Sequence, residues 1–268
     1  MKVSLLISTY NRPDALELCL KSVLHQVYMP DEIIIADDGS KDETRDVIQK
    51  YADLSVVPLQ HVWHEDNGFQ LAMIRNKAIA VANGDYIIQI DGDLILHPYF
   101  VKDHKDFAKR NSFVRGSRIY LDESITNEKI AQLDTNVNRF DNRVSNFFSA
   151  IRIPFLRFLF ENNYKNKGAE SWEIHGCNMA FWRDDAVRIN GYDEDFQGWG
   201  PEDKEFIARL MNMGMRKRFL KLGAIAYHLW HKINTKENLR NNEVIFEETK
   251  RDKKIKCVNG INKYLKSK

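Results

Sequence analysis

Short apolar runs alternate with amphipathic stretches through the first half of the chain. The apolar runs are rich in β-branched residues, as buried strands are, and the stretches between them repeat apolar positions with the helical period. This pattern predicts strands at residues 2–8, 32–36, 56–63, 86–90 and 113–119. It predicts a helix that opens at Pro13, where a missing N–H costs nothing, and helices at 43–52, 70–82 and 98–109. The alternation indicates an α/β fold with a mostly parallel sheet flanked by helices.

The second half of the chain is less regular. Residues 121–167 mix polar turns with an aromatic and basic run and show no clear period. Beyond them the sequence predicts a strand at 177–182, helices at 185–189 and 202–213, a last strand at 223–228 and a basic helix at 250–268. We therefore expect one compact domain made of two halves, residues 1–120 and an α+β extension over residues 121–268.

Composition excludes several classes of protein. Of the 268 residues, 43% are hydrophobic and 29% charged, as in a compact globular protein. The net charge is only +2, so we expect no nucleic-acid partner. Three scattered cysteines favour a reducing compartment. The first apolar run is too short for a signal peptide, and no apolar stretch approaches the ~18 residues of a membrane span. We expect a cytoplasmic protein.

Polar clusters follow four of the predicted strands, at residues 8–12, 37–40, 64–68 and 91–93. Ligands of open α/β sheets bind beyond the carboxyl ends of the strands, so these clusters should converge. Any one of them alone is explained by a turn and a helix cap. Together they suit a nucleotide, because carboxylates accept from a pyrimidine or ribose, Tyr10 can stack on a base, and Arg12 or Arg75 can meet phosphate.

Two further groups of residues suit a divalent cation. Asp91 and Asp93 lie between apolar stretches, where paired carboxylates are costly unless a cation or hydrogen-bond donors compensate them. A calcium EF-hand is excluded because Lys102 stands where its bidentate glutamate belongs, whereas a plain Asp-Gly turn stays open. His228 and His231 follow the last predicted strand, and their spacing can bring both imidazoles to one metal. The alternative is a pair of ordinary core or surface histidines.

The segment 198–205 reads GWGPEDKE. Its proline and acids are explained by the start of a helix, where they complement the dipole. The tryptophan between two glycines is not explained in this way. An indole beside a carboxylate at a helix start suits a platform for a saccharide next to a general base.

Several of these motifs resemble those of a known family. Four segments resemble the nucleotide-sugar-binding half of family 2 glycosyltransferases with the Rossmann-like GT-A fold. They are residues 7–12, 37–40 and 75–76 and the DxD motif at 91–93. Residues 190–193 and 198–203 resemble a C-terminal motif shared by β-1,4-galactosyltransferases, chondroitin-polymerase modules and polypeptide N-acetylgalactosaminyltransferases. The resemblance covers roughly residues 1–120 and 172–235. It implies inverting, metal-dependent transfer of a hexose of galactose or N-acetylhexosamine type from a UDP-sugar to a glycan or lipid-linked glycan, in polysaccharide or lipopolysaccharide synthesis.

The resemblance also implies a role for each matching residue. Asp37 and Asp38 would hold uracil and ribose, and the donor site would further include Thr9, Tyr10, Arg12 and Arg75. Asp91 would contact ribose or sugar. Asp93 would bind Mn²⁺ or Mg²⁺ together with His228 and His231. Asp203 would be the catalytic base, with Glu202 and Trp199 beside it on the acceptor side. Lys204 departs from the galactosyltransferase motif, where a third acid is common, and this leaves the acceptor open.

Two alternative functions remain. A sugar nucleotidyltransferase shares the architecture, but it would need a glycine-rich phosphate loop after the first strand, and residues 8–12 contain no glycine. A non-catalytic glycan-binding module with the same fold is the other. The aromatic and basic run at 147–160 also has two interpretations. One is a peripheral contact with the inner face of the cytoplasmic membrane. The other, which we favour, is a lid or core segment that packs over the acceptor cleft.

Overall fold

The structure is a computed structural model that describes residues 1–161, 167–232 and 238–265. Within these ranges a main sheet contains seven strands and a smaller sheet four. The strands of the main sheet are β1 (Val3–Thr9), β2 (Glu32–Asp37), β3 (Leu59–Trp63), β4 (Tyr86–Asp91), β6 (Ser112–Arg115), β9 (Asn178–Trp182) and β10 (Arg216–Phe219). Those of the smaller sheet are β5 (Leu94–Leu96), β7 (Ile119–Leu121), β8 (Val144–Ser145) and β11 (Ala226–His228).

The main sheet has the order β10-β6-β9-β4-β1-β2-β3. Strands β4, β1, β2 and β3 run parallel to one another, as β6 and β10 do, and β9 runs antiparallel to both β4 and β6. The predicted α/β fold with a mostly parallel sheet is therefore confirmed. Because β9 is reversed, its first residue, Asn178, pairs with Ile90 near the carboxyl end of β4. The loop before β9 thus reaches the same sheet edge as the polar clusters.

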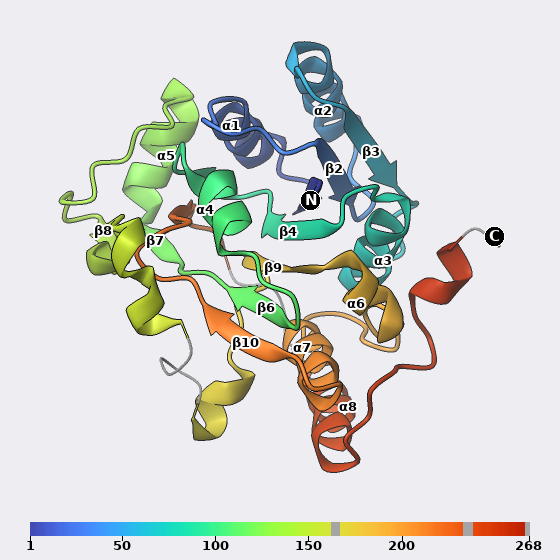
Figure 1. Cartoon of the computed structure of the whole chain (residues 1–268). Coiled ribbons are helices and arrows are strands. Elements are labelled where there is room, and N and C mark those ends of the chain that lie inside the picture. Colours follow the sequence, from blue (N-terminus) through green and yellow to red (C-terminus); the bar gives the residue numbers. More distant parts are fainter. Residues whose placement is uncertain (162–166, 233–237, 266–268) are drawn as a thin grey trace.

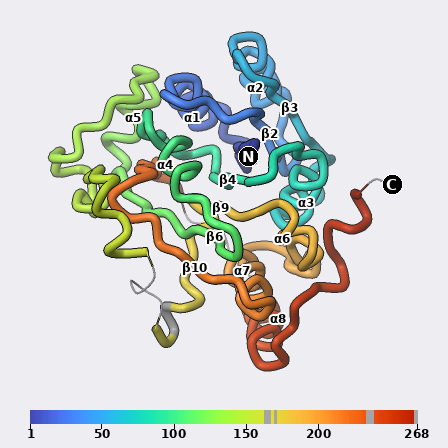
Figure 2. Tube along the Cα trace, in the orientation of Figure 1, coloured from blue at the N-terminus to red at the C-terminus, as the bar shows by residue number. Residues whose placement is uncertain are grey.

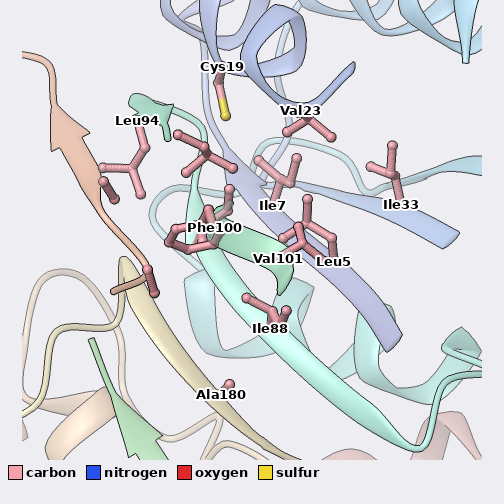
Figure 3. Close-up of a cluster of buried hydrophobic side chains, with 14 of the residues drawn as sticks. Leu5, Ile7, Cys19, Val23, Ile33, Ile88, Leu94, Phe100, Val101 and Ala180 are labelled. Atoms are coloured by element: carbon pink, nitrogen blue, oxygen red, sulfur yellow. The ribbon is translucent and has the colours of Figure 1, made fainter. Parts of the chain in front are cut away.

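Helices cover both faces of the main sheet (Figure 1). They are α1 (Pro13–Leu24), α2 (Asp42–Leu54), α3 (Leu71–Val81), α4 (Phe100–Phe107), α5 (Glu123–Gln132), α6 (Arg183–Arg188), α7 (Glu202–Asn212) and α8 (Leu239–Arg251). Leu5 and Ile7 of β1 pack with α1, α2 and α4, as Figure 3 shows for part of this cluster. Leu6, between them, packs on the opposite face with α3, α6 and α7. This alternation explains why the strand sequence is apolar throughout.

The chain beyond α8 runs back along the molecule to α3 (Figure 2). Its short 3₁₀ helix η4 (Ile261–Tyr264) contacts α3. Three further 3₁₀ helices, η1 (Phe147–Ala150), η2 (Pro154–Phe160) and η3 (Gly168–Trp172), occupy the irregular middle of the chain. No helix among the described residues combines the length and the apolar character that a bilayer span requires.

The predicted strand at 113–119 is wrong as a single element. It consists of β6 in the main sheet and β7 in the smaller one, and the chain crosses between the sheets at Gly116. A Cβ on Gly116 would lie 2.2 Å from the side chain of Asn178, so the crossing needs a glycine. Strand β10, with the sequence RKRF, was not predicted, because its buried Arg218 breaks the apolar pattern. An ion pair with Glu161, at 2.8 Å, satisfies that arginine.

The predicted basic helix at 250–268 is also wrong. The last α-helix, α8, ends at Arg251, and within residues 252–265 only η4 is helical; residues 266–268 lie outside the described part of the chain. Helix α8 itself was missed because its buried positions are Asn242, Phe246 and Thr249, two of which are polar. Helix α5 was missed for a similar reason, since its buried positions include Thr126 and Lys129.

Candidate active site

A cleft of about 1040 Å³ opens at the carboxyl edge of the main sheet. Its lining contains all of the predicted site residues except Asp37: Thr9, Tyr10, Arg12, Asp38, Arg75, Asp91, Asp93, Trp199, Glu202, Asp203, His228 and His231. Sheet register explains part of this convergence, because Thr9 pairs with Asp37 and Ser8 with Asp91 at the ends of three parallel strands. The polar clusters that follow the strands thus lie together at one edge of the sheet, as predicted.

Asp93 lies against the two histidines where the main sheet passes into the smaller one. Strand β11 pairs with β5 so that His228 faces Leu94, and the N–H of Leu229 donates to the carbonyl of Asp93 at 2.9 Å. The Nε2 atom of His228 lies 3.7 Å from Oδ1 of Asp93, and that of His231 lies 3.4 Å from Oδ2. One ligand atom from each of the three residues lies within 4.8 Å of the others.

The hydrogen bonds of the two imidazoles fit a metal ligand set. In both histidines Nδ1 lies 2.8 Å from a backbone carbonyl, that of Leu229 or Lys232, so Nδ1 carries the proton and Nε2 presents a lone pair. Burial lowers the pKa of His228, which favours the neutral form of that ring. Oδ1 of Asp93 is buried and has no hydrogen-bond donor among the described residues. Two imidazole nitrogens and a carboxylate oxygen suit Mn²⁺ and similar divalent ions.

Arg75 contacts acids from two separate segments that line the cleft. Its side chain is almost fully buried, and its guanidinium lies 3.2 Å from Asp91 and 2.9 Å from Asp203. Burial opposes the charge of Arg75, but the carboxylates around it, Asp203 foremost, hold its pKa above the ordinary value. Arg75 is therefore an internal counter-ion that ties the DxD turn to the start of α7, although its residue type equally suits phosphate.

Asp203 and Glu202 occupy the first turn of α7, where the helix dipole favours negative charge. Oδ1 of Asp203 accepts from Arg75 at 2.9 Å and from the hydroxyl of Tyr192 at 3.0 Å. The neighbouring Glu202 is buried, and its Oε2 has no partner among the described residues. Burial, reinforced by the charge of Asp203, raises the pKa of Glu202. The two acids thus differ: the carboxylate of Asp203 is hydrogen-bonded, whereas that of Glu202 is buried and keeps one oxygen with no partner among the described residues.

The two aspartates at the end of β2, Asp37 as its last residue and Asp38 directly after it, differ in their access to the cleft. Asp37 is fully buried, accepts from the backbone N–H of Ser40 and lies 2.8 Å from Nε2 of His61, so it shapes the turn from below. Asp38 lines the cleft, with its Oδ1 at 2.7 Å from Nε2 of His64. Its Oδ2 accepts from the backbone N–H of Gln70 at 2.9 Å.

Trp199 also lines the cleft, and its side chain is 39% exposed. Gly198 has a φ of +70°, and a Cβ on Gly200 would lie 2.5 Å from Asn242, so both glycines are needed to hold the indole in place. Lys204, where the galactosyltransferase motif commonly has an acid, forms an ion pair with Glu173 at 2.9 Å. Both of these charged residues line the cleft.

Sequence reasoning missed several residues that line the cleft, among them Arg118, His175, Trp230 and Lys232. Arg118 lies between the two sheets, where the strand prediction failed, and His175 belongs to the loop that only the reversal of β9 brings to this edge. No residue of 147–160 belongs to the described lining of the cleft. The structure therefore gives the lid interpretation of that run no support.

Two family models match the chain. The model described as Glycosyl transferase family 2 matches residues 4–188, and the model described as N-terminal domain of galactosyltransferase matches residues 156–232. The order of the two matches is that of the two sets of motifs in the sequence, and the predicted resemblance is confirmed.

The curated relatives include two synthases and a glucosyltransferase. The chain is 28% identical to chondroitin synthase of Escherichia coli over 84% of this chain and 34% of that protein. It is 26% identical to hyaluronan synthase of Pasteurella multocida, over 84% of this chain and 24% of that protein. It is 28% identical to validoxylamine A glucosyltransferase of Streptomyces hygroscopicus subsp. limoneus, over 80% of this chain and 48% of that protein. The chain thus spans between about a quarter and a half of the length of these relatives.

Two solved structures share the fold at low sequence identity. The mannosyltransferase PcManGT from Pyrobaculum calidifontis, in complex with GDP-Man and Mn²⁺, has a TM-score of 0.60 at 19% identity, over 86% of this chain and 57% of the other. S. aureus TarS 1-349, in complex with UDP-GlcNAc, has a TM-score of 0.61 at 16% identity, over 87% and 60%.

Proposed function

Since this chain belongs to glycosyltransferase family 2, we propose that it transfers a hexose, with inversion, from a UDP-sugar to a hydroxyl group of a glycan. The observation that carries the proposal is the arrangement of the cleft: its lining brings together the group Asp93, His228 and His231 and the acid Asp203, and Arg75 forms ion pairs with both Asp91 and Asp203. A transferase needs a donor site and a base on the two sides of one sugar, and this cleft offers candidates for both.

The donor side would hold the nucleotide through Asp38, Tyr10 and Thr9, and the diphosphate beside Arg12. Asp93, His228 and His231 are the residues that would hold a divalent cation, for which Mn²⁺ or Mg²⁺ is the chemical match. Such an ion supplies neutralisation of the charge that develops on the leaving diphosphate. The solved complexes of the fold relatives with a nucleotide sugar, and in one case Mn²⁺, support this assignment.

The acceptor side would place a saccharide on Trp199, with its reacting hydroxyl near Asp203. Asp203 then takes the hydroxyl proton as the oxygen attacks the anomeric carbon, and the diphosphate leaves with the bonding electron pair. Attack opposite the leaving group inverts the anomeric centre. Galactose or N-acetylhexosamine donors are proposed from the galactosyltransferase match, and polysaccharide synthesis from the chondroitin and hyaluronan synthase relatives.

We further propose that η2 touches an anionic membrane where a lipid-linked glycan is presented. Phe155, Phe158 and Leu159 of η2 are 73%, 62% and 59% exposed. Arg157 stands among them, as in segments that lie at a lipid interface and pair with anionic headgroups.

A donor screen tests the function. The protein is incubated with a panel of UDP-hexoses, Mn²⁺ and oligosaccharide acceptors, and UDP release is measured with and without acceptor. Turnover with at least one donor, lost in the Asp93→Ala variant, is the expected result. Tight binding of glycans with no UDP release from any donor would instead favour a glycan-binding module. Formation of a nucleotide sugar from UTP and a sugar phosphate would favour a nucleotidyltransferase.

A further inference from the structure

A closed ring of contacts surrounds the carboxylate of Asp203. The side-chain amide of Gln89, on β4, donates to the carbonyl of Gly176 at 3.1 Å, and its Oε1 lies 2.9 Å from the hydroxyl of Tyr192. That hydroxyl lies 3.0 Å from Oδ1 of Asp203. Oδ2 of Asp203 packs against Gly176, since a Cβ there would lie 1.8 Å from it. The carboxylate is thus held from both sides.

The hydroxyl of Tyr192 has one hydrogen and two strong acceptors. A tyrosine hydroxyl donates a single hydrogen bond, yet Asp203 Oδ1 and Gln89 Oε1 both lie within hydrogen-bonding distance, with the sulfur of Met179 a weak third partner at 3.8 Å. Gln89 and Tyr192 are fully buried. The hydroxyl can therefore donate to only one of the two acceptors at a time, and the charge of Asp203 decides which one. An ionised carboxylate is a stronger acceptor than the amide of Gln89, whereas a neutral carboxylic acid is not stronger than that amide.

The ring of Tyr192 is fixed independently of its hydroxyl. It stacks on Phe206 with centroids 4.4 Å apart, and the guanidinium of Arg75 lies 5.3 Å from its centre. The hydroxyl therefore stays between its two acceptors while only its hydrogen rotates. Removing the oxygen alone, as in phenylalanine, leaves both ring contacts in place.

We propose that Tyr192 is a positioning residue for the base: its hydroxyl donates to Asp203 while that carboxylate is ionised and turns to Gln89 when Asp203 has taken the acceptor's proton. The proposal rests on the proposed transferase function. In the step itself the acceptor oxygen bonds to the anomeric carbon, the bond from that carbon to the diphosphate breaks with its electrons on the diphosphate, and the proton ends on Asp203. Tyr192 and Gln89 exchange no proton with the substrate.

The pH dependence of turnover tests this assignment, and two variants should shift it in opposite directions. Tyr192→Phe removes a donor from the ionised carboxylate, so the acid limb of the pH–rate profile should move to higher pH by about one unit. Gln89→Met leaves the Tyr192 hydroxyl only weak sulfur acceptors besides Asp203. This disfavours the protonated form of Asp203, so the acid limb should move to lower pH. The charged groups facing Asp203 in both variants, Arg75, Asp91 and Glu202, are unchanged.

Tyr86→Phe is the matched control. Tyr86 is also fully buried on β4, but its hydroxyl has no partner among the described residues, so its variant should keep the wild-type profile. UDP binding by each variant shows that the cleft is folded. Unshifted acid limbs in both Tyr192→Phe and Gln89→Met, or shifts of the same sign, would overturn the proposal. Absence of any turnover in the wild-type protein would instead remove the proposed function.

Discussion

The Nε2 atom of His231 lies 3.4 Å from Oδ2 of Asp93, although the two residues are 138 positions apart in the sequence. The contact exists because β11 pairs with β5, directly after the DxD turn. A motif at the end of one strand and a histidine after another thereby form a single candidate metal site.

Removing Asp93 should weaken Mn²⁺ binding. The Asp93→Ala variant loses the carboxylate that the two imidazoles face. We expect the Kd for Mn²⁺ in the presence of UDP to rise at least ~10-fold, because removing even a residue that only hydrogen-bonds to a metal ligand weakens metal binding by that factor. Titration calorimetry measures it. His25→Ala, which alters an exposed histidine that is not among the residues lining the cleft, is the control. Equal Mn²⁺ affinity in Asp93→Ala and wild type would rule out this site.

Adding one methyl group at Gly176 should strongly reduce kcat. A Cβ at this position would occupy the place of Asp203 Oδ2, at 1.8 Å, so Gly176→Ala must displace the base. We expect a loss of kcat of about 10²-fold or more, comparable to removing general-base catalysis, with UDP binding retained. Gly214→Ala introduces a methyl group at a positive φ but into open space, and its kcat should stay near wild type. A Gly176→Ala enzyme with normal kcat would show that Asp203 is not held as described.

Glu202 should make the fold less stable as the pH rises. Its pKa is raised by burial, so the folded state keeps a proton that the unfolded chain releases above about pH 4.3. The contribution of Glu202 is present below that pH and is lost as the pH rises towards the folded pKa. The Tm of Glu202→Gln minus the Tm of wild type should therefore become larger as the pH is raised from 4.5 to 8. The corresponding change in the difference of the free energies of unfolding is about 1 kcal/mol or more.

Metal-free calorimetry at several pH values measures this difference. Glu247→Gln changes a largely exposed glutamate on α8, so its Tm difference from wild type should not vary with pH. A constant difference for Glu202→Gln as well would mean that Glu202 is ionised in the folded protein.

The exposed side chains of η2 should carry membrane binding. We expect the protein to float with vesicles that contain anionic lipid at low salt, and a Phe155→Ser/Phe158→Ser double variant to stay in the soluble fraction. Val258→Ser, at a valine that is 93% exposed elsewhere on the surface, should float as wild type does. Wild-type protein that never floats removes the membrane proposal and leaves the transferase proposal intact.

The sequence predicted those parts of the molecule whose signals are local. Apolar strands buried on both faces, such as β1 and β4, and the polar residues that follow them were recognisable because strand, edge and turn are adjacent in the chain. The metal-site candidates were also found from their residue types. Their contact depends on the pairing of β5 with β11, a long-range event without a local signature.

The elements that sequence reasoning missed are those in which polar residues are buried. Strand β10 and helix α8 place Arg218 and Asn242 inside the fold, where partners from distant segments satisfy them. The same holds for Gln89, which a sequence pattern shows only as a polar interruption of an apolar strand. Its partners Tyr192 and Gly176 come from the second half of the chain. Such networks become visible only when the tertiary contacts are known.

The most direct test of the transferase proposal is to separate donor binding from transfer in the Asp203→Asn variant. Asparagine keeps the size of the side chain and its contact with Tyr192 but cannot take the acceptor's proton, so kcat should fall by about 10²–10⁴-fold, while the Kd for UDP with Mn²⁺ stays within about threefold of wild type. Measured on the donor and acceptor that the screen identifies, that result supports Asp203 as the base. Near-normal kcat in Asp203→Asn would contradict it.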